Sequence, residues 1–218
     1  MQKRNILKII TLITMTIDHI GVLLFPQLIA LRIIGRIAFP IVAYQAAEGY
    51  KHTSSLKKYL FRLTVFAFIS QVPYNFIIGH KLNPIFTVIL GLIAIMLWNK
   101  NKVCKVLALA ICVAGVAIPL SYNAYGIFMV FIFEAFSHLP TYRTVMIFIA
   151  LNYVFYINNT DSGLPIQVLS IMALPFIYFV PDADKKEIHV PALFQKRMFY
   201  YVYYPAHITV LYLISKLI

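Results

Sequence analysis

Nearly the whole chain is a succession of apolar segments, and this pattern limits the possible folds more than any other feature. The segments lie near residues 6–26, 28–49, 59–79, 84–99, 103–119, 124–139, 141–157, 164–180 and 198–216. A membrane-spanning helix needs about 20 predominantly apolar residues, and most of these segments approach that length. Strands of a membrane barrel are shorter and alternate between apolar and polar residues, which these segments do not. The sequence therefore predicts an all-α, polytopic transmembrane helical bundle of about nine helices.

The polar stretches between the segments are short, which favours one continuous membrane domain. Of the 218 residues, 61% are apolar and only 12% are charged, whereas soluble domains carry about 25% charged residues. We find no linker and no shift in composition, so we expect residues 1–218 to form a single integral membrane domain. Cys104 and Cys112 have no metal-ligand spacing, and we expect no metal site.

The lysines and arginines predict the orientation of the chain. A net charge of +12 would suggest a nucleic-acid partner in a soluble protein, but these residues lie in the loops between segments. A cytoplasmic N-terminus places 15 of the 19 basic residues on the cytoplasmic side, as the positive-inside rule requires. They are Lys3, Arg4, Lys8, Lys51, Lys57, Lys58, Arg62, Lys100, Lys102, Lys105, Arg143, Lys185, Lys186, Lys196 and Arg197. We therefore expect membrane lipids as partners and no nucleic acid.

Ionisable residues interrupt the first two apolar segments, where each one is costly to insert. Asp18 and His19 lie in the first segment, and Arg32 and Arg36 lie four residues apart in the second. Residues four apart share one face of a helix. An antiparallel hairpin that turns at residues 25–27 would bring the acid, the imidazole and at least one guanidinium to a similar depth.

Two interpretations of these residues remain open. In the chemical one, His19 is a general base, because imidazole titrates near neutral pH, and Arg32 or Arg36 holds a phosphate, a carboxylate or a developing oxyanion. In the structural one, Asp18 forms an ion pair with Arg32 or Arg36 that ties the hairpin together, and His19 is hydrogen-bonded beside it.

Other polar residues carry weaker signals. Glu48 ends the second segment just before Lys51, which favours an interfacial ion pair. Gln71 and Asn75 share a face of the third segment around a proline, where they line a cavity or bond across helices. His207 lies in the last segment with no carboxylate near it in sequence, so a core histidine is the default interpretation.

The motifs of the first third of the chain resemble those of the TraX family of bacterial membrane proteins. They are Leu7-Lys8, Ile17-Asp18-His19-Ile20-Gly21, Leu31-Arg32-Ile33-Ile34-Gly35-Arg36-Ile37-Ala38-Phe39-Pro40, Ala47-Glu48-Gly49-Tyr50, Lys58-Tyr59-Leu60-Phe61-Arg62-Leu63 and Ser70-Gln71-Val72-Pro73-Tyr74-Asn75-Phe76. Later motifs include Asn83-Pro84-Ile85-Phe86-Thr87 and Tyr203-Tyr204-Pro205-Ala206-His207. Two loops depart from the family pattern, at Ser121-Tyr122-Asn123 and at Pro181-Asp182-Ala183-Asp184.

The resemblance implies an acetyltransferase of the bacterial inner membrane that modifies the N-terminal amine of conjugative pilin, with acetyl-CoA as the acetyl donor. A hydroxyl of an envelope glycan or lipid is the other acceptor we consider, because it would need the same base. The resemblance carries over to Asp18, His19, Arg32, Arg36, Glu48 and His207, which stand in the family motifs. We expect His19, Asp18 and Arg36 to be catalytic, and we expect substrate or cofactor binding from Arg32, Glu48, Lys51, Gln71, Asn75 and His207. Direct transfer and a two-step path through an acetyl-imidazole are both compatible with a histidine at this position.

Two other function classes compete with the enzyme. The chain has no glycine-rich phosphate loop and no serine nucleophile elbow, which leaves chemistry by histidine, acid and arginine. The same buried residues would also suit a proton or anion path through a small transporter or channel, although the sequence has no internal repeat. The third class is a non-catalytic assembly factor for a membrane complex.

Overall fold

The computed structural model describes residues 2–157, 166–180 and 197–217. Within these ranges all regular secondary structure is helical, apart from an isolated bridge between Leu82 and Leu120. The helices are α1 (Gln2–Leu23), α2 (Ile29–Gly35), α3 (Ala38–His52), α4 (Leu56–Ile78), α5 (Pro84–Trp98), α6 (Lys102–Ala114), α7 (Asn123–Ala135), α8 (Thr141–Ile157), the 3₁₀ helix η2 (Ile166–Ala173), α9 (Leu174–Phe179) and α11 (Arg197–Ser215). The predicted all-α fold is confirmed.

Each predicted apolar segment coincides with a helix or with a pair of consecutive helices. The second segment is divided between α2 and α3, and the eighth between η2 and α9. The division between α2 and α3 has a local cause, because Pro40 has no amide hydrogen for the carbonyl four residues earlier, which belongs to Arg36. Arg36 is the C-cap of α2, so the interruption coincides with one of the charged residues.

Among the residues that the structure describes, three helical stretches are long and apolar enough to cross a membrane: Lys3–Leu23, Ile29–His52 and Leu56–Ile78. Shorter apolar helices follow at Pro84–Trp98, Asn123–Ala135, Thr141–Ile157 and Ile166–Phe179. Numerous large apolar side chains on these helices are exposed, among them Phe61, Phe68 and Val72 on α4. A lipid environment accounts for such exposure, and the chain is an all-α helical membrane protein.

The chain divides into two compact units. Unit 1 comprises residues 1–42 and 164–218, and unit 2 comprises residues 43–163. The expectation of one continuous membrane domain stays a prediction. The loop motif at 181–184 and the lysines 185, 186 and 196 lie outside the described residues.

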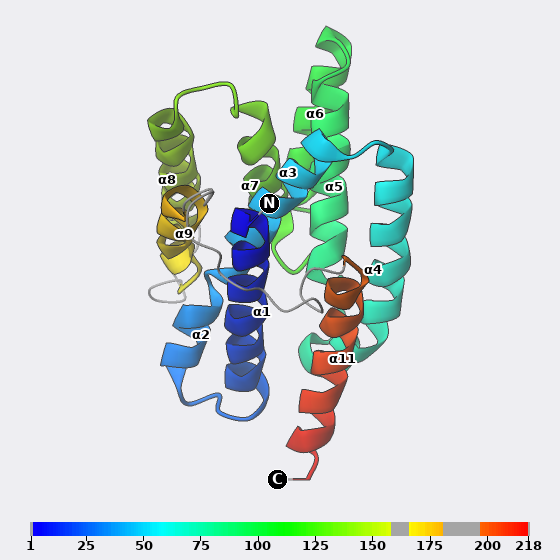
Figure 1. Ribbon diagram of the computed structural model, residues 1–218, viewed down its shortest axis with the longest axis vertical. Helices are drawn as coiled ribbons and strands as arrows, with labels where there is room; N and C mark the ends of the chain where they lie inside the picture. Colours follow the sequence, from blue (N-terminus) through cyan, green and yellow to red (C-terminus); the bar gives the residue numbers. More distant parts are fainter. Residues whose placement is uncertain (1, 158–165, 181–196, 218) are drawn as a thin grey trace. The chain divides into compact units, whose positions relative to one another are not determined.

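Unit 1 is built on the predicted hairpin of α1 and α2, which the turn after Leu23 joins (Figure 1). The two helices approach closely where glycines lie between them. A methyl group on Gly35 would lie 2.1 Å from Oδ1 of Asp18, and one on Gly21 would lie 2.8 Å from Cβ of Leu31. The hairpin contact therefore depends on the absence of side chains at these glycines. Helix α11 packs against α1, and η2 packs against α2 and α9.

Unit 2 packs α5 against α4, α6 and α7 (Figure 1). Here too a glycine allows close approach, since a methyl group on Gly91 of α5 would lie 2.5 Å from Cβ of Val130 on α7. Asn83 begins α5 as its N-cap and accepts a hydrogen bond from the Ile85 amide, and Pro84 occupies the first helical position. Ser121 and Tyr122, in the loop that departs from the family pattern, lie between α6 and α7, and Asn123 is the first residue of α7.

Candidate functional site

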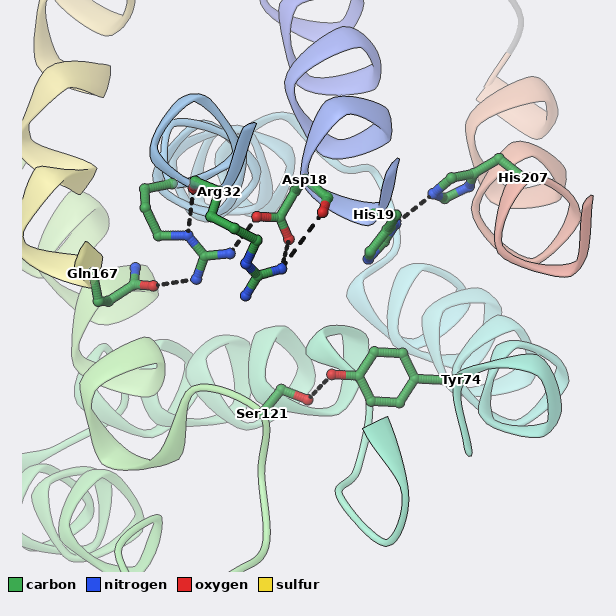
Figure 2. A network of polar contacts seen from close by, with 8 residues as sticks. Asp18, His19, Arg32, Tyr74, Ser121, Gln167 and His207 are labelled. Atoms are coloured by element: carbon green, nitrogen blue, oxygen red, sulfur yellow. Dashed lines mark hydrogen bonds and ion pairs between the residues drawn. The ribbon is translucent and has the colours of Figure 1, made fainter. Parts of the chain in front are cut away.

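The buried charges of unit 1 gather around Asp18, as Figure 2 shows. Asp18 and His19 lie in the last third of α1, Arg32 lies on α2, and Arg36 caps that helix. Gln167 comes from η2 and His207 from α11. Of these residues, Asp18, His19, Arg36, Gln167 and His207 are buried. The hairpin thus brings residues of its two helices together as the sequence predicts, and two further helices complete the group.

Asp18 pairs with both arginines. Nη1 of Arg32 donates to Oδ2 of Asp18 at 3.0 Å, and Nη2 of Arg36 donates to Oδ1 of the same carboxylate. The sequence left open which arginine pairs with Asp18, and the structure places one on each oxygen. The four-residue spacing of the arginines explains this arrangement, because it directs both guanidiniums to one face of α2.

Arg36 is held by three different groups. Besides the bond to Asp18, its Nε donates to the Arg32 carbonyl at 3.2 Å and its Nη1 donates to Oε1 of Gln167 at 2.8 Å. A guanidinium with its donors fixed in a plane suits such a set of acceptors. Nε2 of Gln167 is buried and has no hydrogen bond among the described residues. This amide hydrogen-bond donor is therefore available to a ligand beside Arg36.

Gln167 is a site residue that the sequence reasoning missed. It is uncharged and lies 131 positions after Arg36, so no local spacing connects the two. A signal was nevertheless present, because Gln167 is an amide near the start of an otherwise apolar segment. Amides inside apolar helices ordinarily bond to another helix, and this one bonds to Arg36.

His19 contacts a second histidine rather than the carboxylate beside it in sequence. Its Nδ1 lies 2.8 Å from Nε2 of His207, and both rings are buried. Figure 2 shows the two imidazoles facing each other from α1 and α11. Nδ1 of His207 lies 2.8 Å from the carbonyl oxygen of Tyr203, one turn earlier in α11. His207 is thus a buried histidine, as expected, but it also belongs to the group of polar residues around His19.

A second contact between α1 and α11 supports this pair. The Thr16 hydroxyl donates to the Leu12 carbonyl at 2.7 Å and lies 2.7 Å from the Tyr203 hydroxyl, which therefore donates to Thr16. The Tyr203 ring stacks on the His207 ring, with their centroids 4.9 Å apart and the planes inclined by 13°. Tyr203 thus fixes both the position of α11 and the plane of the His207 ring.

The other predicted site residues lie in unit 2 and form local contacts. Nζ of Lys51 lies 2.9 Å from Oε1 of Glu48 and 3.3 Å from Oε2 of Glu134 on α7. The predicted ion pair at the end of α3 is therefore present, with a second carboxylate added. His52 also bonds through Nδ1 to the Glu48 carbonyl at 2.9 Å.

Gln71 and Asn75 are in direct contact, as their shared helix face predicts. Nε2 of Gln71 donates to the side-chain oxygen of Asn75 and to the Lys81 carbonyl, while its Oε1 accepts from the backbone and side-chain nitrogens of Asn83. In the same unit the Tyr74 hydroxyl donates to Ser121, which donates to the Leu82 carbonyl (Figure 2). These bonds link α4 to the turn before α5. Of the two roles expected for Gln71 and Asn75, lining a cavity or bonding to another segment, Gln71 has the contacts of the second.

In the part of the chain that the structure describes, no group of three or more His, Cys, Asp or Glu side chains could hold a metal ion. The polar cluster of unit 1 consists of one carboxylate, two guanidiniums, two imidazoles and one amide. Its guanidiniums suit anionic groups, and its imidazoles can take up or release protons.

Comparison with known proteins gives a consistent result. The family model described as "TraX protein" matches residues 3–215. The chain is 25% identical over 229 residues to "Probable fimbrial assembly protein FimC, serogroup H1" of Dichelobacter nodosus, covering 94% of this chain and 92% of that protein. It is 41% identical over 69 residues to "Uncharacterized protein RP591" of Rickettsia prowazekii (strain Madrid E), covering 32% of this chain and 26% of that one. No solved structure matches the chain significantly. Because the family model covers nearly the entire sequence, the chain belongs to the TraX family.

Proposed function

We propose that this protein is a multi-pass acetyltransferase of the bacterial inner membrane, which moves an acetyl group from acetyl-CoA to an amine or a hydroxyl. Membership of the TraX family supports this proposal, since the family resemblance implies pilin acetylation. The relative from Dichelobacter nodosus, whose printed name is a probable fimbrial assembly protein, supports a connection with pili. The acceptor is accordingly the N-terminus of a pilin, or an envelope glycan or lipid that presents a hydroxyl.

The observation that carries the proposal is the buried histidine of α1 beside two guanidiniums. His19 is 7% exposed and directly follows Asp18, whose carboxylate accepts hydrogen bonds from Arg32 and Arg36. An imidazole can remove the proton of an attacking amine or hydroxyl. When the acceptor attacks the thioester carbonyl, the carbonyl oxygen becomes negative, and guanidinium and amide donors stabilise such a charge. Arg36 and the Gln167 amide are the donors we expect to serve there.

The chain topology suits a donor that arrives from the cytoplasm. Nine spans with a cytoplasmic N-terminus follow from the distribution of lysines and arginines. The ADP end of coenzyme A is polyanionic, and Lys51 in the last turn of α3 and Lys57 and Lys58 in the first turn of α4 would attract it.

The proposal predicts a specific loss of activity in one variant. Purified protein in detergent is incubated with labelled acetyl-CoA and a membrane extract of its host, and labelled products are identified by mass spectrometry. Wild type and His138→Ala, which changes an exposed histidine, should both transfer label, whereas His19→Ala should not. Both variants are first compared with wild type by thermal melting, so that loss of the fold is recognised.

The same assay rejects the enzyme if a folded wild type neither binds acetyl-CoA nor transfers label. Uptake of protons or anions by vesicles containing the protein would then favour a transporter or channel. If His19→Ala transfers label as fast as wild type, acetyl transfer can stand, but His19 is not its base. A labelled peptide amine, sugar or lipid in the active samples names the acceptor.

A further inference from the structure

The carbonyl of Tyr203 fixes the position of one proton on His207. A carbonyl oxygen accepts hydrogen bonds and cannot donate them, so the 2.8 Å contact with Nδ1 of His207 requires a hydrogen on Nδ1. Without that hydrogen, a nitrogen lone pair would face an oxygen lone pair inside the protein, where no water could relieve the repulsion. A neutral His207 therefore carries its proton on Nδ1 and a lone pair on Nε2.

The proton position on His207 determines the proton position on His19. The lone pair on Nε2 of His207 faces Nδ1 of His19 at 2.8 Å, so Nδ1 of His19 must be the donor. A neutral imidazole has only one hydrogen, and the lone pair of His19 is consequently on Nε2. No hydrogen bond engages this Nε2 among the described residues. The ring planes are inclined by 28°, so the bond can run close to both planes, along the nitrogen lone pair.

We propose that His207 is a positioning residue that fixes His19 as the Nδ1–H tautomer and thereby leaves its Nε2 lone pair for the acceptor substrate. The inference deepens the proposed function and rests on it for the role of the lone pair. Two successive hydrogen bonds link the Tyr203 carbonyl to His207 and His207 to His19. All three residues lie on α11 and α1, which belong to the same unit. The stacked Tyr203 ring and its hydroxyl bond to Thr16 prevent His207 from turning away.

The proton balance of the transfer step follows from this tautomer. The acceptor N–H or O–H bond breaks as the Nε2–H bond of His19 forms, and the acceptor nitrogen or oxygen bonds to the acetyl carbonyl carbon. His19 is then an imidazolium whose Nδ1–H still donates to His207, which spreads the positive charge over two rings. When the C–S bond breaks, its electron pair goes to sulfur, and the proton on Nε2 neutralises the thiolate. His19 returns to its starting tautomer without rotating.

Nitrogen NMR of the histidine rings tests the tautomer without any need for catalysis. Protein labelled with ¹⁵N in its histidines is studied in detergent, and the signals of His19 and His207 are identified from their loss in His19→Ala and His207→Leu. We expect protonated Nδ1 and unprotonated Nε2 in both rings of wild type. In His207→Leu, His19 should show a mixture of tautomers. A wild-type spectrum with the His19 proton on Nε2 would overturn the inference.

Two substitutions at position 207 test whether His19 needs only a hydrogen-bond acceptor there or needs the imidazole ring itself. The amide oxygen of His207→Gln can still accept from Nδ1 of His19, so this variant should retain the His19 tautomer and transfer label within about ten-fold of wild type. His207→Leu offers no acceptor and should lose much of the 10²–10⁴-fold that general base catalysis contributes. If His207→Leu and His207→Gln both melt like wild type and transfer label at equal rates, His207 does not position His19.

The NMR and the transfer assay fail independently. If wild type shows the expected tautomer but no acetyl transfer, the proposed function is wrong, while the assignment of the protons in the His19–His207 pair stands. If wild type transfers label but His19 shows the opposite tautomer, the enzyme stands and the role of His207 is wrong.

Discussion

Replacing Asp18 with asparagine removes the carboxylate that contacts both arginines of α2. Removal of one partner of a buried ion pair costs about 3–5 kcal/mol, because the remaining charge stays buried. Two features place the cost of Asp18→Asn near the lower end of this energy range. Arg36 keeps its bond to Gln167, and the Arg32 side chain is 27% exposed, so it can move toward polar surroundings. We expect the variant to lose about 3 kcal/mol of unfolding free energy.

Unfolding in mixed micelles by titration with sodium dodecyl sulfate, followed by circular dichroism, measures this loss. Glu48→Gln is the matched control, since it also removes a carboxylate from a pair with a basic residue. That pair is 31% and 29% exposed at Glu48 and Lys51, so its loss should cost at most about 1 kcal/mol. If Asp18→Asn also loses at most about 1 kcal/mol of unfolding free energy relative to wild type, the carboxylate does not hold the hairpin together.

A double variant tests whether the effect belongs to the pair. If Asp18 acts through Arg36, then Arg36→Gln added to Asp18→Asn should cost less than the sum of the two single changes, by about 0.5–3 kcal/mol. Additive costs would mean that Asp18 stabilises the protein through other contacts.

Three further variants test single contacts. Gly35→Ala puts a methyl group 2.1 Å from Oδ1 of Asp18, so we expect a loss of about 1–3 kcal/mol by overpacking; unchanged thermal melting in detergent would contradict the close approach. Arg36→Lys replaces the planar guanidinium with a point charge. The rate of acetyl transfer should fall by about 10²-fold, as when an oxyanion donor is lost. A retained rate would argue against Arg36 as an oxyanion donor. Glu134→Gln leaves Lys51 with one carboxylate and should cost about 1 kcal/mol in the detergent titration; a much larger cost would indicate that this pair is effectively buried.

The hairpin at the centre of the site could be predicted because all its determinants are local. A proline-containing turn at residues 25–27 separates two apolar segments, and the spacing of Arg32 and Arg36 fixes their common face. Their pairing with Asp18 was foreseen, but not the sharing of one carboxylate. That detail depends on how closely the helices approach, and Gly35 determines it by having no side chain.

The partners supplied by distant helices could not be predicted from one sequence. His19 and His207 are 188 positions apart, and Arg36 and Gln167 are 131 apart. Hydrophobic periodicity locates a helix and its apolar face, yet it does not say which helices become neighbours. A histidine in an apolar helix without a nearby acid is ordinarily a core residue, so the default interpretation of His207 missed its partner for a physical reason.

The two interpretations of the buried charges concern different residues. Both oxygens of the Asp18 carboxylate accept from arginines of the adjacent helix, so Asp18 has the contacts of a structural ion pair. His19, its neighbour in sequence, points about 100° away around α1 and meets α11 instead. Its lone-pair nitrogen remains available, as a base requires. About 100° around α1 thus separates the carboxylate that holds the hairpin from the imidazole that can accept a proton. In the proposed transfer the arginines would serve both groups, because the carboxylate that anchors them also sets where their positive charge lies.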